Sequence, residues 1–582
     1  MRTGTVKRRV CLFFLFCLIF FARGSGATAG NLSANLQKAL QSLSPDEEIA
    51  VVVTFHDKAN IHLFKDPDKH FRRWQIVHSL KAKAELTQRP LETFLKDRGA
   101  KRIVPLWIKN GMAVTARSQV VLELADHPAV ESIILDETIQ VPLVGYGVSA
   151  KPEWNVKAIH APKLWALGYT GQGIVVADMD SGVDLNHPDL KTKWRGGTNS
   201  WYDPNGEHDT PFDANGHGTN VMGIIVGGNA GGTAIGVAPD AKWIAVKVFN
   251  DAGVASLSAV HQGFQWLLNP DGNPGTDDAP DVVNVSWALE NPNRCSLEFQ
   301  SDIEALQSAG IAIVFSAGNY GPLLSTSPSP ANSPGAFGVG AVSRSKHIAS
   351  FSSRGPSACD GGIYPAVVAP GVNVKTSDLT GGGIFTDSYV FVTGTSFAVP
   401  HVAGAMALLL NAFPNLTVPV LEFVLRKSAL DLGPHGADNT YGYGFVNVMG
   451  AYNDLIHPKP KIAASASSYQ FGPIEVGGAS SQTLTIFNFG MADLSIESVV
   501  LSGSTTSEFN IEYDSCSHQT LTPLSSCTVD ILFSPIRGGV RSNKLRVSSD
   551  DPSKHTLNLP LKGIGIKPDP LRLFRSSNEN FF

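Results

Sequence analysis

The chain has 582 residues, of which 43% are hydrophobic and 17% are charged, and its formal net charge is −5. These values are typical of a folded protein with several domains, and they exclude a chain that is disordered over most of its length. Because basic residues form no cluster outside the N-terminus, nucleic acid is excluded as an expected partner.

Residues 1–29 have the pattern of a secretory signal peptide. An apolar run from Val10 to Phe21 is shorter than the roughly 20 residues that a membrane helix needs. The small residues Ala27-Thr28-Ala29 follow it as a cleavage site, and four basic residues precede it: Arg2, Lys7, Arg8 and Arg9. We therefore expect a secreted protein, extracellular or periplasmic, with no membrane span in its mature form, because no later run is long and charge-free enough.

Residues 30–148 are expected to form a separate small domain. The run of β-branched residues from Glu47 to Phe55 indicates a strand. The elements predicted after it are a helix over 71–95, strands within 103–116, a helix over 119–126 and a strand over 130–135. This β-α-β-β-α-β order predicts a ferredoxin-like unit. The alternative is an unrelated N-terminal domain that stays attached.

Residues 149–455 alternate short apolar strands with helical runs. The predicted strands are 173–177, 243–249, 282–287, 311–315 and 337–342, and the predicted helices are 256–268, 297–308 and 396–413. This alternation predicts an α/β domain with a doubly wound parallel sheet. The glycines over 168–173 precede a strand, whereas a dinucleotide fingerprint must follow one, so no nucleotide site is expected.

Three polar residues stand where such folds place their sites. Asp180 follows a buried strand, His217 lies between two glycines at the start of a helix, and Ser396 precedes an Ala-rich apolar helix. A helix N-terminus favours negative charge developing beside Ser396. Taken singly, each residue has a structural alternative, since Asp180 and Ser396 could be helix caps and a lone His is usually a packing residue.

The order Asp180, His217, Ser396 in these contexts resembles the subtilisin-like serine peptidases, or subtilases. The run Ser316-Ala317-Gly318-Asn319, which follows an apolar strand, matches the segment that carries the family's oxyanion-hole Asn. The resemblance implies an endopeptidase in which Ser396 is the nucleophile, His217 the base, Asp180 its orienting group and Asn319 the oxyanion donor.

The resemblance also implies the partners of such an enzyme. Substrates are proteins or peptides, substrate contacts come from Ser286, Ala288 and Gly318, and no cofactor is needed for catalysis. Residues 30–148 resemble the inhibitory propeptide of the family. The alternative function is an inactive peptidase scaffold that serves as an adhesin or binding module.

Within the family, the chain is most similar to bacillopeptidase F-type enzymes. The similarity lies in Trp154-Asn155-Val156, in Asp213 to Thr219 and in Asn284 to Trp287. Three residues depart from the usual motifs. Asn220 replaces a His, Ala288 replaces a Gly on the strand that should pair with substrate, and Val399 replaces a small polar residue near the nucleophile.

A structural calcium ion is a further implication of the resemblance, and the residues support it only in part. Asp189 matches a carboxylate ligand of the common site. The partner loop, residues 231–237, lacks the expected Asn, and calcium requires six to eight oxygen ligands.

The last part of the chain is expected to be all-β. A linker over 456–466, rich in Pro, Lys, Ser and Ala, precedes short alternating segments over 467–566, and residues 567–582 form a tail. The segment resembles Ig-like domains appended to exported bacterial proteins, and contact with a surface or glycan and a spacer role both stay open. In an exported protein we expect Cys516 and Cys527 to form a disulfide, whereas the pairing of Cys295 with Cys359 is left open.

Overall fold

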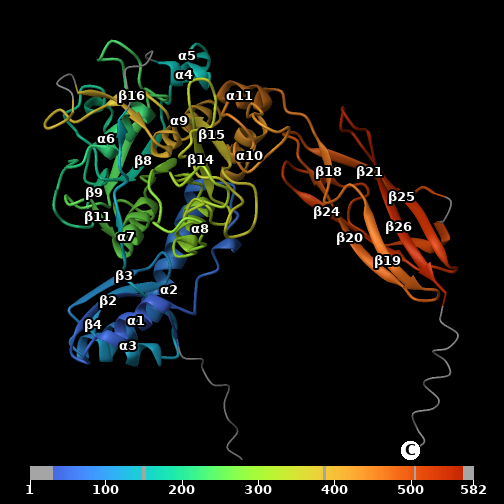
Figure 1. Cartoon of the computed structure of the whole chain (residues 1–582), viewed down its shortest axis with the longest axis horizontal. Coiled ribbons are helices and arrows are strands. Elements are labelled where there is room, and N and C mark those ends of the chain that lie inside the picture. Colours follow the sequence, from blue (N-terminus) through green and yellow to red (C-terminus); the bar gives the residue numbers. More distant parts are fainter. Residues whose placement is uncertain (1–29, 147–152, 385–387, 504–505, 568–582) are drawn as a thin grey trace, which may run out of the picture. The chain divides into compact units, whose positions relative to one another are not determined.

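The computed structural model describes residues 30–146, 153–384, 388–503 and 506–567 (Figure 1). The expected signal peptide, the expected domain boundary at 148–149 and nearly all of the expected tail lie outside these residues. Contacts divide the chain into two compact units. The first comprises residues up to 58, residues 83–105 and residues 110–136, and the second comprises residues 59–82, 106–109 and everything from 137 onward.

The first unit is built on a five-stranded sheet with the order β1-β5-β2-β4-β3. Its elements are β1 (Asn31–Leu32), α1 (Ala34–Ser42), β2 (Glu48–Phe55), β3 (Arg102–Leu106), β4 (Gly111–Arg117), α3 (Ser118–Ala125) and β5 (Val130–Leu135). The central strand β2 pairs antiparallel with both β4 and β5. The order of β2 to β5 confirms the expected ferredoxin-like topology, and β1 is an additional edge strand beside β5.

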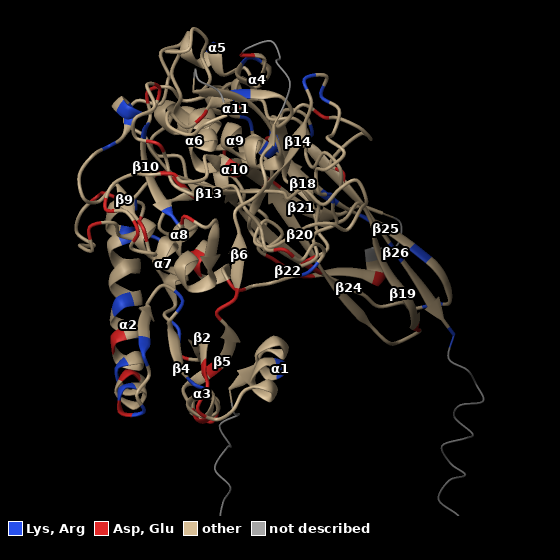
Figure 2. Ribbon diagram, turned by 60° about the vertical axis from the view of Figure 1, so that its left-hand side comes forward, with Lys and Arg blue, Asp and Glu red and all other residues tan. Residues whose placement is uncertain are grey.

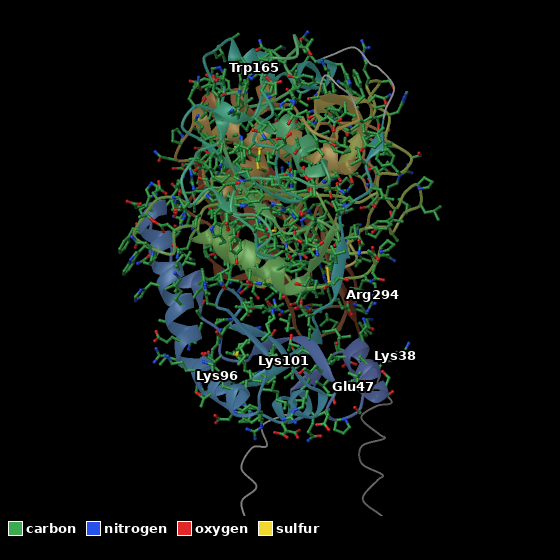
Figure 3. The ribbon with its side chains drawn as sticks, turned by 90° about the vertical axis from the view of Figure 1, so that its left-hand side faces the viewer. Lys38, Glu47, Lys96, Lys101, Trp165 and Arg294 are labelled. Atoms are coloured by element: carbon green, nitrogen blue, oxygen red, sulfur yellow. A yellow bond between two sulfur atoms is a disulfide. The ribbon has the colours of Figure 1, made fainter. Side chains whose placement is uncertain are left out.

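Apolar side chains from one face of this sheet form the core of the first unit. Val51, Val53 and Val114 are essentially inaccessible to solvent, whereas charged residues such as Lys38 and Lys101 lie on the outside (Figure 3). The long helix α2 (Lys69–Asp97) runs through both units and carries basic and acidic residues interspersed along its length (Figure 2).

The main sheet of the second unit has seven strands in the order β15-β14-β13-β12-β8-β10-β9, and each neighbouring pair is parallel. The strands are β8 (Val175–Asp180), β9 (Trp201–Tyr202), β10 (Lys242–Lys247), β12 (Val282–Val285), β13 (Ala312–Ser316), β14 (Phe337–Val342) and β15 (Val367–Pro370). This arrangement confirms the predicted parallel α/β sheet.

Helices surround this sheet. They are α4 (Trp154–Ala158), α5 (Ala161–Trp165), α6 (His217–Val226), α7 (Leu257–Leu268), α8 (Gln300–Ser308), α9 (Val399–Ala412), α10 (Val418–Lys427) and α11 (Val448–Ile456). Trp165, labelled in Figure 3, fixes α5 by donating from its indole nitrogen to the carbonyl oxygen of Val237 at 2.9 Å. Helix α9 is buried along almost its whole length and forms the centre of the hydrophobic core.

Two expectations about α9 need correction. The helix begins at Val399 and not at Ser396, because Thr395–Phe397 form a separate 3₁₀ turn, η3, and Pro400 occupies the first helical turn. The second expectation was that no run after the signal peptide is long and charge-free enough for a membrane span. Among the described residues, Thr395–Ala412 is long and apolar enough, and 83% of it is buried inside the protein.

Short elements complete the second unit. They are η1 (Ile61–Leu63), β6 (Thr138–Gln140), β7 (Gly145–Tyr146), η2 (Lys191–Lys193), β11 (Val254–Ser256), β16 (Val374–Ser377) and β17 (Tyr389–Thr393). Strand β6 pairs antiparallel with β11, and β7 pairs antiparallel with β17. The chain that follows residue 136 therefore runs along two strands of the α/β domain.

The C-terminal part is a sandwich of two sheets, with the orders β18-β20-β24-β22 and β19-β26-β25-β21-β23. Its elements are β18 (Ile462–Ala464), β19 (Tyr469–Glu475), β20 (Ser480–Asn488), β21 (Leu494–Leu501), η4 (Thr506–Glu508), β22 (Phe509–Asp514), β23 (Thr520–Leu521), β24 (Ser526–Phe533), β25 (Gly539–Ser549) and β26 (Thr556–Ile566). Strand β18 lies within the range expected to be a linker. The sandwich confirms the all-β expectation.

The described part of the chain contains two disulfides. Cys516 pairs with Cys527 inside the sandwich, as expected. Cys295 pairs with Cys359 in the α/β domain, which answers the question that sequence spacing left open.

Candidate active site

The structure brings Asp180 and His217 into direct contact. Asp180 is the last residue of β8 and is 1% exposed. Its Oδ1 accepts a hydrogen bond from the Ser181 N–H at 2.7 Å and lies 2.8 Å from His217 Nδ1. Because Nδ1 faces the carboxylate, Nε2 is the ring nitrogen left to accept a proton.

Glycine at position 218 allows this contact. His217 is the first residue of α6, and the Gly218 N–H donates to Ser181 Oγ at 2.9 Å, which ties the start of the helix to the end of β8. A Cβ atom at position 218 would lie 2.1 Å from the Gly182 carbonyl oxygen, closer than any real contact. Only glycine lets α6 approach β8 this closely.

Ser396 lies on the turn η3, between β17 and α9. Its Oγ donates to the Ser286 carbonyl oxygen at 2.8 Å, and Ser286 Oγ donates in return to the Ser396 carbonyl oxygen at 3.0 Å. His217 Nε2 is buried and makes no hydrogen bond to any described residue. The Ser396 hydroxyl therefore donates its hydrogen bond to a backbone carbonyl oxygen, and Nε2 of His217 has no hydrogen-bond partner among the described residues.

His401 holds the turn that carries Ser396. Its Nδ1 bonds to the Phe397 carbonyl oxygen at 2.9 Å, and its Nε2 lies 2.9 Å from Asn155 Nδ2. Burial lowers the pKa of His401 to about 3, so the ring is neutral. A neutral ring can donate through one nitrogen and accept through the other, as both contacts require.

Asn319 follows β13 and is oriented by the residue before Ser396. Its Oδ1 accepts hydrogen bonds from the N–H of Thr395 at 3.0 Å and from Thr395 Oγ1 at 2.8 Å. These bonds fix the amide so that Nδ2 is the end directed away from Thr395 and available as a donor. Sequence reasoning missed Thr395, although a polar residue directly before the serine was visible.

The three predicted substrate contacts lie on two adjacent segments. Ser286 is fully buried and Ala288 is half-buried, and both follow β12. Gly318 has φ +88° and its carbonyl oxygen accepts from the Ser353 N–H at 2.9 Å. A Cβ atom there would lie 2.6 Å from the Pro328 ring, so position 318 has room for glycine alone.

Of the departures from the family motifs, Asn220 has a clear structural role. Its Nδ2 donates to the Ser377 carbonyl oxygen at 2.7 Å, which joins α6 to β16.

The residues around Asp189 do not fit a calcium ion. Asp189 is 3% exposed, and its Oδ1 accepts from the Ala230 N–H at 2.9 Å. Its Oδ2 accepts from the Tyr389 hydroxyl at 2.7 Å. Both oxygens thus face hydrogen-bond donors, whereas calcium would need further oxygen acceptors at this place. The sequence could not show this, because Tyr389 is distant in the chain.

Chelation and mutation should show whether hydrogen bonds or a calcium ion stabilise the region around Asp189. An excess of EDTA should leave the thermal unfolding midpoint unchanged. Tyr389→Phe should lower the free energy of unfolding by about 1–3 kcal/mol, because it leaves a buried carboxylate oxygen without its donor. Calorimetry on the full chain measures both, and an EDTA-induced drop that calcium reverses would contradict the expectation.

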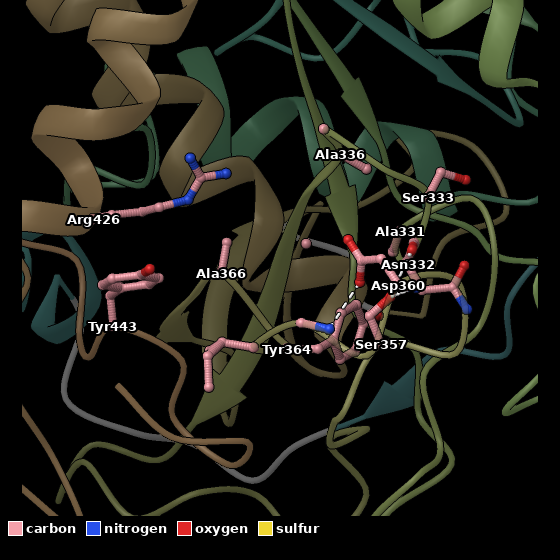
Figure 4. A pocket seen from close by; sticks show the side chains of 14 residues that line it. Ala331, Asn332, Ser333, Ala336, Ser357, Asp360, Tyr364, Ala366, Arg426 and Tyr443 are labelled. Atoms are coloured by element: carbon pink, nitrogen blue, oxygen red, sulfur yellow. Dashed lines mark hydrogen bonds between the residues drawn. The ribbon is translucent and has the colours of Figure 1, made fainter. Parts of the chain in front are cut away.

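Two other features of the α/β domain lie apart from these residues. A cavity of about 270 Å³ is lined by loop residues such as Asn332 and Asp360 and by Arg426, and none of the predicted site residues lines it (Figure 4). Glu207, His208 and Asp251 gather within reach of one metal ion. The ammonium of Lys247 lies 3.1 Å from Glu207 and 3.0 Å from Asp251, so a lysine already balances the negative charge of these carboxylates where a metal ion would bind.

The parallel sheet carries a buried carboxylate–imidazole pair at the end of one strand, and a serine stands at the entrance to a buried helix. These features define an α/β serine hydrolase. Residues 171–444 match the subtilase family, and residues 460–563 match the HYDIN/CFA65/VesB-like, Ig-like domain family. The chain belongs to the subtilase family and is a subtilisin-like serine peptidase.

Individual relatives agree with this assignment. Subtilisin E of Bacillus subtilis is 34% identical over 359 residues, which are 61% of this chain and 84% of that protein. A subtilisin of Bacillus pumilus is 37% identical over 300 residues, 51% of this chain and 98% of that protein. Bacillopeptidase F of Bacillus subtilis is 34% identical over 499 residues, 74% of this chain, and this chain spans about a third of its length.

Proposed function

We propose that the protein is a secreted serine endopeptidase that hydrolyses peptide bonds through an acyl-enzyme intermediate. Ser396 is the nucleophile, His217 the general base and acid, and Asp180 the group that orients His217. The observation that carries the proposal is the 2.8 Å contact between Asp180 and His217 Nδ1, which leaves the buried Nε2 as a proton acceptor. The catalytic step uses no metal or cofactor.

Catalysis begins with a change in the hydrogen bond of Ser396. Its hydroxyl leaves the Ser286 carbonyl and turns toward His217 Nε2, a kind of adjustment that bound substrate often completes. His217 accepts the proton as Oγ attacks the scissile carbonyl, and then returns it to the leaving amine. The carboxylate of Asp180 stabilises the imidazolium that exists between these two transfers.

The developing oxyanion is bound by the Asn319 amide and the Ser396 N–H. The two hydrogen bonds from Thr395 support this role, because they hold the amide in place before substrate arrives. A donor that is already oriented costs no reorganisation when the charge develops.

Asn319→Ala should lower kcat by roughly 10²–10³-fold with a smaller change in KM, because the amide binds charge that exists fully only in the transition state. This magnitude is the one known for the matching residue of subtilisin, a relative of this chain. Steady-state kinetics on a peptide substrate measure it. An unchanged kcat would reassign the oxyanion donor.

The proposed substrates are proteins and peptides bound as extended strands. This is supported by the way the chain's own residues 138–146 lie in the second unit. Val141 donates its N–H to the Gly253 carbonyl oxygen at 2.8 Å beside β11, and Gly145 pairs with Thr393, three residues before Ser396. An extended segment can therefore lie along β11 and β17 next to the nucleophile.

We further propose that residues 30–148 act as an inhibitory propeptide. Their attachment to the α/β domain is supported by buried charge pairs within the second unit. Lys109 is 4% exposed, and its ammonium contacts Glu298 and lies 3.2 Å from His261 Nε2. Burial acts to raise the pKa of Glu298, but Lys109 and His261 lower it to about 2. A charge buried in this way requires its partner, which favours a specific complex.

Secretion is supported by the signal-peptide pattern and by the two disulfides, which persist in oxidising compartments. No specific observation favours the inactive scaffold as an alternative, and we propose no ligand for the Ig-like domain. A fluorophosphonate probe tests the proposed function directly. Rapid labelling at Ser396 supports it, and a protein that hydrolyses peptides without labelling at Ser396 contradicts it.

A further inference from the structure

The mechanism leaves one buried carboxyl group beside the triad unused. Asp178 lies two residues before Asp180 on β8, so both side chains point to the same face of the sheet. It is 1% exposed and belongs to a strand that is otherwise apolar up to Asp180. A buried carboxyl group in a strand interior is costly unless it is neutral or fully bonded, so its retention calls for an explanation.

Asp178 begins a chain of hydrogen bonds that ends at the nucleophile. On the neighbouring strand β12, Asn284 stands directly opposite Asp178, and its Nδ2 donates to Asp178 Oδ1 at 3.0 Å. The same Nδ2 donates to Ser286 Oγ at 2.8 Å. Ser286 Oγ then donates to the carbonyl oxygen of Ser396 at 3.0 Å. All four side chains are buried.

Two oxygen atoms in this chain make no hydrogen bond to any described residue, namely Asp178 Oδ2 and Asn284 Oδ1. While Asp178 is ionised, both are acceptors, and each unsatisfied acceptor costs about 1–3 kcal/mol. A proton on Oδ2 turns one of the two into a donor. A neutral carboxylic acid and a primary amide can then exchange two hydrogen bonds.

The charges around Asp178 also favour its neutral form. Burial, followed by the negative charge of Asp180 and then that of Asp213, raises its pKa well above the usual carboxyl range, against the effect of the Asn284 hydrogen bond. On the neighbouring strand β10, the cation Lys247 is bonded to Glu207, Asp251 and the Phe249 carbonyl oxygen. From α6, the titratable group is His217, which is bonded to Asp180.

We propose that Asp178 is a positioning residue: as a neutral carboxylic acid it orients Asn284 and Ser286, and through them holds the backbone of Ser396 in its reactive place. This inference rests on the proposed function, in which Ser396 is the nucleophile. Its consequence is that Asp178 adds no negative charge beside Asp180. The Ser396 N–H, one of the two oxyanion donors, belongs to the backbone that this chain restrains.

Two substitutions at position 178 test the proposal in the full-length protein, with Ser396→Ala measured alongside to check the proposed function separately. Asp178→Asn is always neutral and keeps one donor and one acceptor, so it should leave kcat close to that of the wild type. Asp178→Val fits a buried strand but cannot hydrogen-bond, and it should lower kcat by roughly 10–100-fold with little change in KM, as expected for a displaced reacting group.

A double-mutant cycle shows whether the effect passes through Ser286. Combining Asp178→Val with Ser286→Ala should cost no more than Ser286→Ala alone, because both break one chain. Additive losses would mean that Asp178 acts by another route and would overturn the proposal. An Asp178→Asn protein as slow as Asp178→Val would also overturn the proposal. So would a shift of the acid limb of the pH–rate profile to lower pH in Asp178→Asn, because that shift requires an ionised Asp178 in the wild type.

A stability measurement keeps the proposal testable if Asp178→Val does not fold. In the folded wild type the raised pKa keeps Asp178 protonated at pH values where the unfolded chain has lost the proton. The free energy of unfolding therefore falls as pH rises from the usual carboxyl range to the folded-state pKa. In the Ser396→Ala background, which cannot digest itself, Asp178→Asn should gain thermal stability relative to Asp178 as pH rises. Parallel pH dependences would contradict a neutral Asp178.

Discussion

Replacing Ser396 with alanine is expected to lower kcat by about 10⁶-fold, the loss known for the same change in subtilisin, and to stop maturation of the chain. In the proposed mechanism the hydroxyl forms the covalent bond to substrate, and an alanine offers no nucleophile in its place. The substitution removes one oxygen atom whose hydrogen bond goes to the Ser286 carbonyl, so the fold should be retained.

Maturation should stop because the proposed propeptide continues into a segment, residues 145–146, that pairs with β17 just before Ser396. Residues 138–146 lie along β11 and β17 within the second unit, and a tethered peptide meets Ser396 at a high effective concentration. The purified wild type should lose its N-terminal domain, whereas Ser396→Ala should accumulate at its propeptide-bearing size. Electrophoresis and N-terminal sequencing measure both.

The exposed Ser345 offers a matched control, since Ser345→Ala removes the same atom from the surface and should mature normally. Maturation of purified Ser396→Ala to the wild-type N-terminus, in the absence of other proteases, would contradict self-processing.

The sequence predicted the elements that depend on local patterns. Runs of apolar, β-branched residues such as 337–342 became buried parallel strands with the same bounds, because strands covered on both faces leave little choice of residue. The order of Asp180, His217 and Ser396 was readable because each lies within two residues of a glycine whose backbone freedom or small size the fold requires.

Features that depend on contacts between distant segments were not predictable. Tyr389 supplies a donor to Asp189 from 200 positions away, and no local pattern announces that the expected calcium ligand is already bonded. The 3₁₀ turn at Ser396 depends on packing of the segment between β17 and α9, which overrides the helical pattern of the sequence. No role was predicted for Asp178, because its partner Asn284 is known only once the register of β8 and β12 is known.

The pair Asp178 and Asp180 allows a final comparison within one strand. Asp180→Asn should lower kcat by about 10⁴-fold, the order known for loss of this carboxylate in other serine-protease triads. Asp180 Oδ1 accepts from His217 Nδ1, and an amide in its place carries no charge to stabilise the imidazolium and can present its NH₂ to the ring. The proton then moves to Nε2, where it blocks acceptance of the Ser396 proton.

The matched control is Asp178→Asn, which makes the same chemical change on the same face of the same strand, two residues away. It should retain nearly full kcat, because the proposed neutral acid and an amide hydrogen-bond in the same way. Kinetics of both variants, normalised to the amount of mature enzyme, give the comparison. Equal losses would show that any change in this buried polar face disables the enzyme. A large loss for Asp180→Asn alone, together with the loss expected for Asp178→Val, would show that the two carboxyl groups of β8 act differently: Asp180 supports His217, and a neutral Asp178 holds the backbone of Ser396.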